Sequence, residues 1–242
     1  MFLAIDIGNT NVTCGIHDGN TWIKIIRISS NMNFENQFNI LKKYKVNNAA
    51  ISSVVPQLTD LYHKSITHIF QINAFIIDYK NSNINLDVIT PKEVGVDRIC
   101  NCAAAIEIGK LPVIIGDIGS ATNYDIVNQK RAFIGGAIAP GLEVAARNLL
   151  SKAALLKDTT FIVPVNAIGK DTNSNLQSGI MLGAIDVIDG MFKRIQIEAG
   201  WNDVNNIITG GFGKLISPHL KTKHLFIPTL TLDGIKLIHD RQ

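Results

Sequence analysis

Short apolar runs that end in polar turns set the pattern of the first part of the chain. Residues 1–5 form one run, and two β-rich runs, 12–17 and 21–28, flank the turn Asp18-Gly19-Asn20. Apolar runs of this length bounded by turn residues are typical of strands, and the intervening residues suit a hairpin turn. The first three strands are therefore predicted to form an antiparallel meander.

Helical and strand patterns alternate in the next part. Apolar residues recur at helical spacing over 33–44 and 58–69, whereas 49–55 and 74–77 are short apolar runs typical of strands. The first half is thus predicted to fold as β-β-β-α-β-α-β.

The strand-and-turn pattern returns after a loop and a helix. The loop is predicted over the polar, Asn-rich residues 80–93, and the helix over the alanine-rich residues 99–106. Residues 111–115 then form an apolar run that leads into a second Asp-Ile-Gly turn at Asp117.

The repeat extends beyond the turn, because strands are predicted over 124–127 and 132–135, as after the first copy. Self-similarity of this length in two copies predicts two homologous lobes, residues 1–110 and 111–242. If their turns face each other, Asp6 and Asp117 line one cleft, where small ligands usually bind.

Glycine-rich segments suggest turns and irregular structure in the rest of the chain. The glycine-rich residues 135–141 predict an irregular segment, and a helix is predicted over 142–150. A strand over 206–208 ends in Thr209-Gly210-Gly211, which is either a plain turn or a platform for the base or ribose of a nucleotide; a helix follows Gly213.

A long helix is predicted over 176–195, after the polar loop 168–172. One face of this helix carries six apolar residues: Ile180, Ala184, Val187, Ile188, Met191 and Ile195. Its three glycines, Gly179, Gly183 and Gly190, each cost about 1 kcal/mol relative to Ala in a helix interior, so close packing against another element is expected there.

Composition narrows the class of protein. The 242 residues are 46% hydrophobic, enough for one large or two modest domains with a real core. The formal net charge of +3 is spread along the chain without a basic block, which argues against a nucleic-acid partner. No basic leader precedes Asp6 and no run approaches about 18 apolar residues, so a cytoplasmic location without a membrane partner is expected.

The cysteines and histidines give no metal signature. Cys14, Cys100 and Cys102 lack the spacing of zinc or redox motifs and are predicted to be reduced, buried thiols. The six histidines show no ligand spacing either.

The repeated turn has a definite chemistry. The segment Asp6-Ile7-Gly8-Asn9-Thr10-Asn11 and its copy, which includes Ser120 and Thr122, offer backbone N–H groups and short polar side chains to a triphosphate, although a plain structural turn is the simpler alternative. Carboxylates beside phosphates repel them, so Asp6 and Asp117 make sense with cations between, which favours Mg²⁺ with nucleotide. Asp97, near the start of the predicted helix, either complements the helix dipole, pairs with Arg98, or serves as the base of a phosphoryl transfer.

Seven segments in this order resemble the type III pantothenate kinase family. They are Asp6–Thr13, Ser53–Pro56, Gly95–Arg98, Asp117–Thr122, Gly135–Gly141, Ile168–Thr172 and Thr209–Gly211. The resemblance implies the α/β, two-lobed actin-like fold of sugar kinases and heat-shock ATPases, with duplicated mixed five-stranded sheets. It also implies a homodimer that phosphorylates pantothenate with ATP, in the first step of coenzyme A synthesis.

The resemblance also implies residue roles. Asp97 is similar to the catalytic base, and Gly95, Val96, Asp97, Arg98 and Thr172 to substrate-binding positions, with Thr172 supplied by the dimer mate. Asp6 would bind Mg²⁺ through water, and Asp117 a monovalent cation, K⁺ or NH₄⁺. The ATP-binding positions would be Asp6, Ile7, Gly8, Asn9, Thr10, Asn11, Val12, Thr13 and Ser120.

Three positions depart from the family pattern. Ser120 and Asn123 stand where the family usually has threonine, and Val88 stands where an aromatic residue is common. Two other functions stay open at this point: a non-catalytic regulatory protein on the same scaffold, and a kinase for another small hydroxyl compound.

Overall fold

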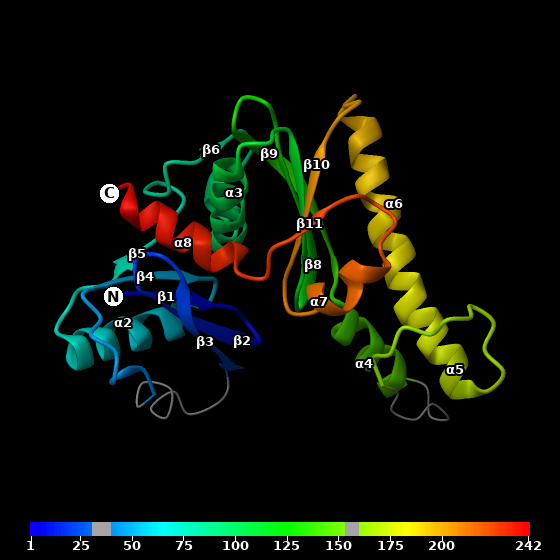
Figure 1. Cartoon of the computed structure of the whole chain (residues 1–242), viewed down its shortest axis with the longest axis horizontal. Coiled ribbons are helices and arrows are strands. Elements are labelled where there is room, and N and C mark those ends of the chain that lie inside the picture. The colour runs from blue at the N-terminus through cyan, green and yellow to red at the C-terminus, as the bar shows by residue number, and fades with distance from the viewer. Residues whose placement is uncertain (31–39, 153–159) are drawn as a thin grey trace. The chain divides into compact units, whose positions relative to one another are not determined.

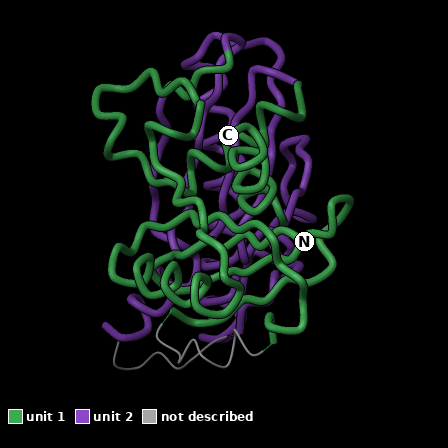
Figure 2. Tube along the Cα trace, turned by 90° about the vertical axis from the view of Figure 1, so that its left-hand side faces the viewer, with its two compact units in different colours: residues 1–109, 131–134, 229–242 green, residues 110–130, 135–228 purple. Residues whose placement is uncertain are grey.

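The computed structural model describes residues 1–30, 40–152 and 160–242 (Figure 1). The chain divides into two compact units (Figure 2). Unit 1 comprises residues 1–109, 131–134 and 229–242, and unit 2 comprises residues 110–130 and 135–228. The lobe boundary expected between residues 110 and 111 stays a prediction, but the end of the chain groups with unit 1.

The sheet of unit 1 has the strand order β3-β2-β1-β4-β5. Its strands are β1 (Phe2–Ile7), β2 (Asn11–His17), β3 (Trp22–Ser29), β4 (Asn48–Ser53) and β5 (Phe75–Ile76). The first three strands are antiparallel, which confirms the meander, and β4 and β5 add in parallel to β1.

The second sheet repeats this order. Its strands are β7 (Val113–Ile118), β8 (Ala121–Val127), β9 (Ala132–Pro140), β10 (Asn205–Thr209), β11 (Leu225–Phe226) and β6 (Asn85–Leu86). The order β11-β10-β7-β8-β9-β6 contains the five-strand arrangement of the first sheet, with β10 parallel to both β7 and β11. The predicted duplication is therefore confirmed.

Two local predictions for this sheet are wrong. Residues 80–93 are not only a loop, because Asn85 and Leu86 pair with Ala132 and Phe133 and make a sixth strand that is too short to leave a periodic signal. The glycine-rich segment 135–141 is not irregular, because β9 runs on to Pro140. Gly135 accommodates this strand with a φ of +117°, a conformation that side-chain-bearing residues rarely adopt.

The helices agree largely with the predicted ones, apart from α8, which was not predicted. They are α2 (Pro56–Phe70), α3 (Val96–Ile108), α4 (Leu142–Lys152), α5 (Thr172–Gln177), α6 (Gly183–Glu198), α7 (Gly213–Ile216) and α8 (Leu230–Asp240), with a π-helix η2 (Ser178–Leu182) and short 3₁₀ turns η1 (Pro91–Glu93) and η3 (Ser217–His219). Pro56 begins α2, where its missing N–H costs nothing, and Gly109 ends α3 at a φ of +81°. Most of the helix predicted over 33–44 lies outside the described residues.

The long helix predicted over 176–195 is a succession of α5, η2 and α6. Its buried face is made by Met181, Ile185, Ile188 and Phe192, whereas Val187 is 55% exposed, so the predicted apolar face is wrong in part. The wider π turn shifts the residues that follow it around the helix axis. Close packing at its glycines is also wrong, because a Cβ on Gly179, Gly183 or Gly190 would have no neighbouring atom within 4 Å.

Alternation along β1 decides which residues face which helices. Leu3, Ile5 and Ile7 pack in one cluster with Tyr62 and Ile66 of α2. Phe2 and Ala4 pack in another cluster, with residues of α3 and α8 on the other side of the sheet (Figure 1). Since side chains alternate along a strand, Asp6 belongs to the side of α3.

Candidate active site

The turn after β1 is a closed loop of four residues. Ile7 pairs with Val12, and the Gly8 N–H donates to Asn11 O at 2.9 Å. Ser30 holds the turn from outside, because its hydroxyl donates to Gly8 O at 2.8 Å and its N–H to Thr10 O at 2.9 Å. Asn9 and Thr10 are left exposed at the tip.

Asp6 lies at the base of this turn and is half-buried. It lies beside Ser52 in the parallel register of β1 and β4, and Ser52 Oγ donates to Asp6 Oδ1 at 3.1 Å. The carboxylate is therefore oriented by a neighbour that is itself completely buried.

Asp97 occupies the first turn of α3. Its Oδ1 accepts the N–H of Arg98 at 2.8 Å. A Cβ on Gly95 would lie 2.5 Å from the same oxygen, so glycine leaves room for the carboxylate to fold back over the helix start. Burial raises the pKa of Asp97, against the opposing effect of the Arg98 N–H and guanidinium. A carboxylate with a raised pKa is better suited to accept a proton near neutral pH.

Asp6 and Asp97 act on a common neighbour, which is Cys100 of α3. Burial raises the pKa of this thiol well above its usual range, the negative charges of Asp6 and Asp97 raise it further, and a hydrogen bond with Ser52 opposes them. The structure therefore brings Asp6 and Asp97, predicted from separate motifs, into one region of unit 1.

Arg98 also belongs to this region. Its guanidinium carbon lies 5.4 Å from the centre of the Phe133 ring, a cation–π arrangement that holds the side chain. Phe133 is itself paired with Leu86 of β6, so this short strand helps to place the ring that Arg98 contacts.

The second turn is one residue shorter than the first. Ile118 pairs with Thr122, which encloses three residues, and Asp117 pairs with Asn123, as Asp6 pairs with Thr13. Asn123 is therefore the structural equivalent of Thr13. Its departure from the family's threonine lies directly opposite Asp117, at the base of the second turn.

Two glycines that the motifs contained but did not explain pack against this turn. A Cβ on Gly210 would collide with Asp117 Oδ1, and Gly210 has a φ of +90°. A Cβ on Gly141 would collide with Ser120 O. The turn holding Asp117 and Ser120 is therefore packed against the ends of β10 and β9, and the Thr209–Gly211 segment lies beside Asp117.

Thr172 lies on the surface of unit 2 as the first residue of α5. Asp171 caps this helix, with its carboxylate accepting the Ser174 N–H at 3.0 Å and the Ser174 hydroxyl reaching back, which makes a capping box. The predicted roles of these site residues are not decided by this placement and stay predictions.

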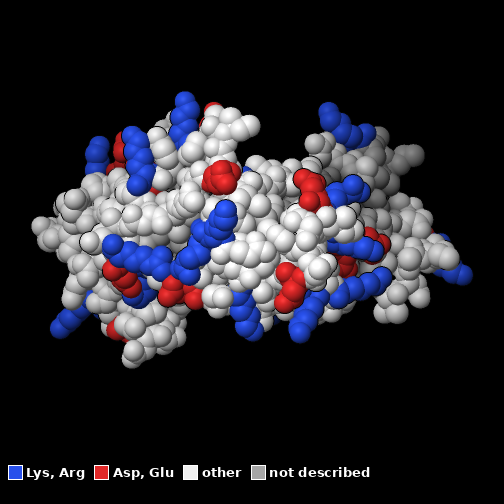
Figure 3. All heavy atoms as spheres, turned by 90° about the horizontal axis from the view of Figure 1, so that it is seen from above, with Lys and Arg blue, Asp and Glu red and all other residues white. Residues whose placement is uncertain are grey.

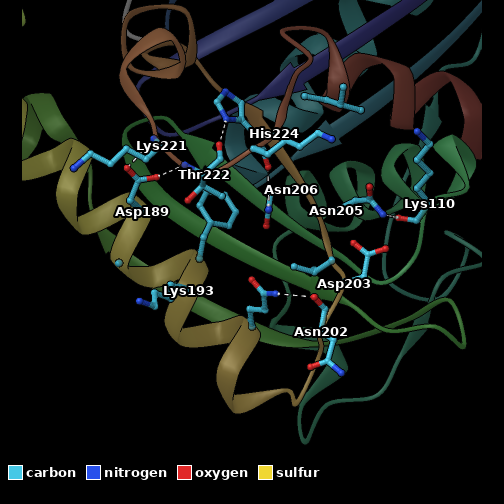
Figure 4. A pocket seen from close by; sticks show the side chains of 16 residues that line it. Lys110, Asp189, Lys193, Asn202, Asp203, Asn205, Asn206, Lys221, Thr222 and His224 are labelled. Atoms are coloured by element: carbon cyan, nitrogen blue, oxygen red, sulfur yellow. Dashed lines mark hydrogen bonds between the residues drawn. The ribbon is translucent and has the colours of Figure 1, made fainter.

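A pocket of about 800 Å³ in unit 2 lies away from the turn that follows β7 (Figure 4). It is lined by Lys110, Asn205 and Asn206, among others, and so lies by the first residues of β10, whereas Asp117 and Gly210 lie by its last ones. Asn206 Oδ1 has no hydrogen-bond partner, but it is itself buried and offers no surface to a ligand. Within unit 2, the pocket is therefore separate from the turn that holds Asp117.

Surface charge, metal-ligand clusters and helix hydropathy bear on the expected partners. On the face drawn in Figure 3, acidic and basic side chains are interspersed. Within residues 1–30, 40–152 and 160–242, no group of three or more His, Cys, Asp and Glu could hold a metal ion by itself. In those same ranges no helix combines the length and the apolar character needed to cross a bilayer.

The fold and the carboxylate-bearing turns define an actin-like, sugar-kinase type of protein. A solved structure from Sinorhizobium meliloti, described as a 2-dehydro-3-deoxygalactonokinase, covers 100% of this chain and 96% of its own, with a TM-score of 0.58 at 13% identity. A Baf family protein from Campylobacter jejuni, described as a transcriptional activator, gives 0.65 at 20% identity, covering 99% and 98%. At these identities the likeness concerns the fold, and it confirms the fold predicted from sequence.

The family follows from sequence comparison. The model of the type III pantothenate kinase family matches residues 2–194. Type III pantothenate kinase of Agathobacter rectalis is 32% identical over 100% of this chain and 98% of its own length, and that of Finegoldia magna is 35% identical over 99% and 97%. The chain belongs to the type III pantothenate kinase family, as its motifs predict.

Proposed function

We propose that this protein transfers the γ-phosphoryl group of ATP to the primary hydroxyl of pantothenate, forming 4'-phosphopantothenate in the first step of coenzyme A synthesis. The observation that carries the proposal is that, in a chain of this family, Asp6 faces the side of the sheet covered by α3 and Asp97 lies in the first turn of that helix. Phosphoryl transfer needs positioning and charge neutralisation more than covalent chemistry by the protein. Asp6 would hold the Mg²⁺ that neutralises the phosphates, and Asp97 would orient and deprotonate the attacking hydroxyl.

Asp97 is the proposed base. It would accept the proton of the attacking hydroxyl of pantothenate, and its raised pKa suits this task. Gly95, Val96 and Arg98 would bind the substrate around it, since Arg98 is already held against Phe133.

Mg²⁺ fits the residues around Asp6. Mg²⁺ is usually held by one or two carboxylates, waters and substrate phosphates, so a site with few protein carboxylates is compatible with it. Asp6, oriented by Ser52, would hold the ion through water. The ion, when bound, neutralises charge on the phosphates.

The nucleotide would be bound by both copies of the turn. Asp6, Ile7, Gly8, Asn9, Thr10, Asn11, Val12 and Thr13 would form the phosphate loop, and Ser120 a further contact. Asp117, with Gly210 packed against it, would ligate a monovalent cation, K⁺ or NH₄⁺, that offsets the charge of the carboxylate beside phosphate.

A homodimer in the cytoplasm completes the proposal. Thr172 is exposed at the start of α5, where it is available to a second copy. Cys14, Cys100 and Cys102 are buried thiols outside any disulfide, which suits a reducing compartment.

The test is an acceptor assay. Purified protein with ATP, Mg²⁺ and pantothenate, with and without K⁺, should release ADP and yield phosphopantothenate detectable by mass spectrometry. Pantetheine and glucose, run in parallel, test for another hydroxyl acceptor. ATP binding without any product at saturating pantothenate would instead support a non-catalytic protein, and faster turnover of another acceptor would reassign the substrate.

A further inference from the structure

We propose that Ser52 is a positioning residue that links the carboxylate of Asp6 to helix α3 and thereby fixes Asp6 relative to Asp97. The inference rests on the proposed function for its catalytic consequence. Its geometric basis lies entirely within unit 1.

The first half of the link joins two strands. Ser52 is 0% exposed and lies beside Asp6 in the register of β1 and β4. Ala50, two residues earlier, packs on the side of α3 and α8, so Ser52 faces the same side by strand alternation. Its hydroxyl donates to Asp6 Oδ1 at 3.1 Å.

The second half joins the strand to the helix. Ser52 also hydrogen-bonds Cys100, which is completely buried on α3. The side of β4 that carries Ser52 faces α3, since Ala50 of β4 and Cys100 of α3 pack in one buried cluster. Cys100 follows Asp97 by three residues, so the two side chains are neighbours along one helix face.

This buried link explains how the carboxylates of Asp6 on β1 and Asp97 on α3 keep a fixed spacing. A hydrogen bond to a carboxylate is about twice as strong as one between neutral groups, so Asp6 is held firmly. Misplacing a catalytic group by about 1 Å can cost about 10²-fold in rate. Losing the Ser52 hydroxyl should therefore affect nucleotide–metal binding and turnover together.

The experiment compares two adjacent serines. Ser52→Ala should lower kcat by about tenfold to a hundredfold, as expected for misplacement of a reacting group, with KM for pantothenate little changed. Independently of turnover, it should weaken binding of Mn²⁺ with a non-hydrolysable ATP analogue, measured by EPR and calorimetry. Ser53→Ala is the matched control, since Ser53 hydrogen-bonds Val55 and Thr59 at the start of α2 instead. It should leave metal–nucleotide binding unchanged.

A second pair of variants tests the link from the helix side. Cys100→Ser retains a hydrogen-bonding group and should behave as wild type, whereas Cys100→Ala should reproduce the Ser52→Ala effects. If Ser52→Ala does not fold, as judged by circular dichroism, the proposal is tested by kcat and by Mn²⁺–nucleotide binding of Cys100→Ser and Cys100→Ala. Unchanged metal–nucleotide binding in the folded variants, or equal losses in Ser53→Ala, would overturn the proposal. If the wild type fails to phosphorylate pantothenate, the binding measurement still tests Ser52, so the two failures are distinguishable.

Discussion

At the scale of single residues, Asp97 combines two demands that oppose each other. The start of a helix favours a negative charge, and Asp97 accepts the Arg98 N–H there. Burial works against that charge and prevails, so its pKa is raised. The carboxylate is thus kept at some cost to the fold, as functional residues often are.

Asp97→Asn should keep the fold and lose most turnover, because the amide cannot accept the hydroxyl proton. A general base of this kind typically contributes about 10² to 10⁴ in rate, and kcat should fall within that range with KM for ATP little altered. Steady-state kinetics with pantothenate measure this. A near-normal kcat would place the base at another residue.

The raised pKa of Asp97 also predicts a stability effect. A folded-state pKa above the unfolded one means that the folded protein binds this proton more tightly, so the associated stability is complete below the unfolded pKa of about 3.9 and is lost as pH rises through the folded pKa. At neutral pH the ionised carboxylate therefore costs stability, and Asp97→Asn should melt at a higher temperature than the wild type. The difference should shrink as pH is lowered. A lower melting temperature for the variant at neutral pH would contradict this account.

At the scale of elements, α8 determines where α3 lies. Leu232, Ile235 and Ile238 of α8 share one cluster with Ile99 and Cys100 of α3. Asp233 reinforces the placement, because Trp22 Nε1 and Thr229 Oγ1 donate to its carboxylate at 2.6 and 2.8 Å. The end of the chain thus supports the helix that carries Asp97.

Gly234→Ala should destabilise the protein by about 1 to 3 kcal/mol, the usual cost of overpacking, because its Cβ would collide with the backbone of Cys100. Chemical denaturation followed by circular dichroism measures the loss. Gly190→Ala is the matched control: a Cβ there meets nothing within 4 Å, and alanine gains about 1 kcal/mol in helix propensity. Equal stability of Gly234→Ala and wild type would show that α3 and α8 can separate without cost.

The elements also show what sequence patterns could and could not predict. Short apolar or β-rich runs located β1, β2 and β3, and helical spacing located α2 and α3, because each pattern depends on burial along one element. The pairing of Asn85 and Leu86 and the π turn at Ser178 depend on tertiary contacts that leave no local period. The sequence motifs contained Asp6 and Asp97, but the link through Ser52 and Cys100 requires knowing which side of the sheet each residue faces.

At the scale of the whole molecule, duplication explains why two Asp-Ile-Gly turns exist. Both sheets share one strand order, and both turns follow the strand that is parallel to its inner neighbour. In each copy a buried hydroxyl residue lies beside the aspartate in the strand register, Ser52 beside Asp6 and Thr209 beside Asp117, and Gly210 packs against Asp117 in the second copy. The proposed roles assign Mg²⁺ and phosphate to the first copy and a monovalent cation to the second.

The proposed homodimer has a natural surface on unit 2. A groove of about 330 Å³ lies between α4 and the helical run η2–α6, and its lining includes Leu149, Ile180 and Val187. Val187 is 55% and Leu149 47% exposed, so the groove presents apolar side chains at the surface of the described part of unit 2, as interaction sites often do. A second copy that covers this groove would bury them.

Val187→Glu should therefore convert the dimer to a monomer, because a carboxylate buried in an apolar contact loses its hydration without a compensating partner. Light scattering coupled to size-exclusion chromatography measures the mass, and pantothenate turnover should fall in parallel because Thr172 is expected to act in the site of the mate. Ile197→Glu is the control on the same helix, since Ile197 is 69% exposed but does not line the groove. It should remain a dimer with normal turnover. A monomeric wild type, or a Val187→Glu variant that stays dimeric, would exclude this groove as the subunit interface.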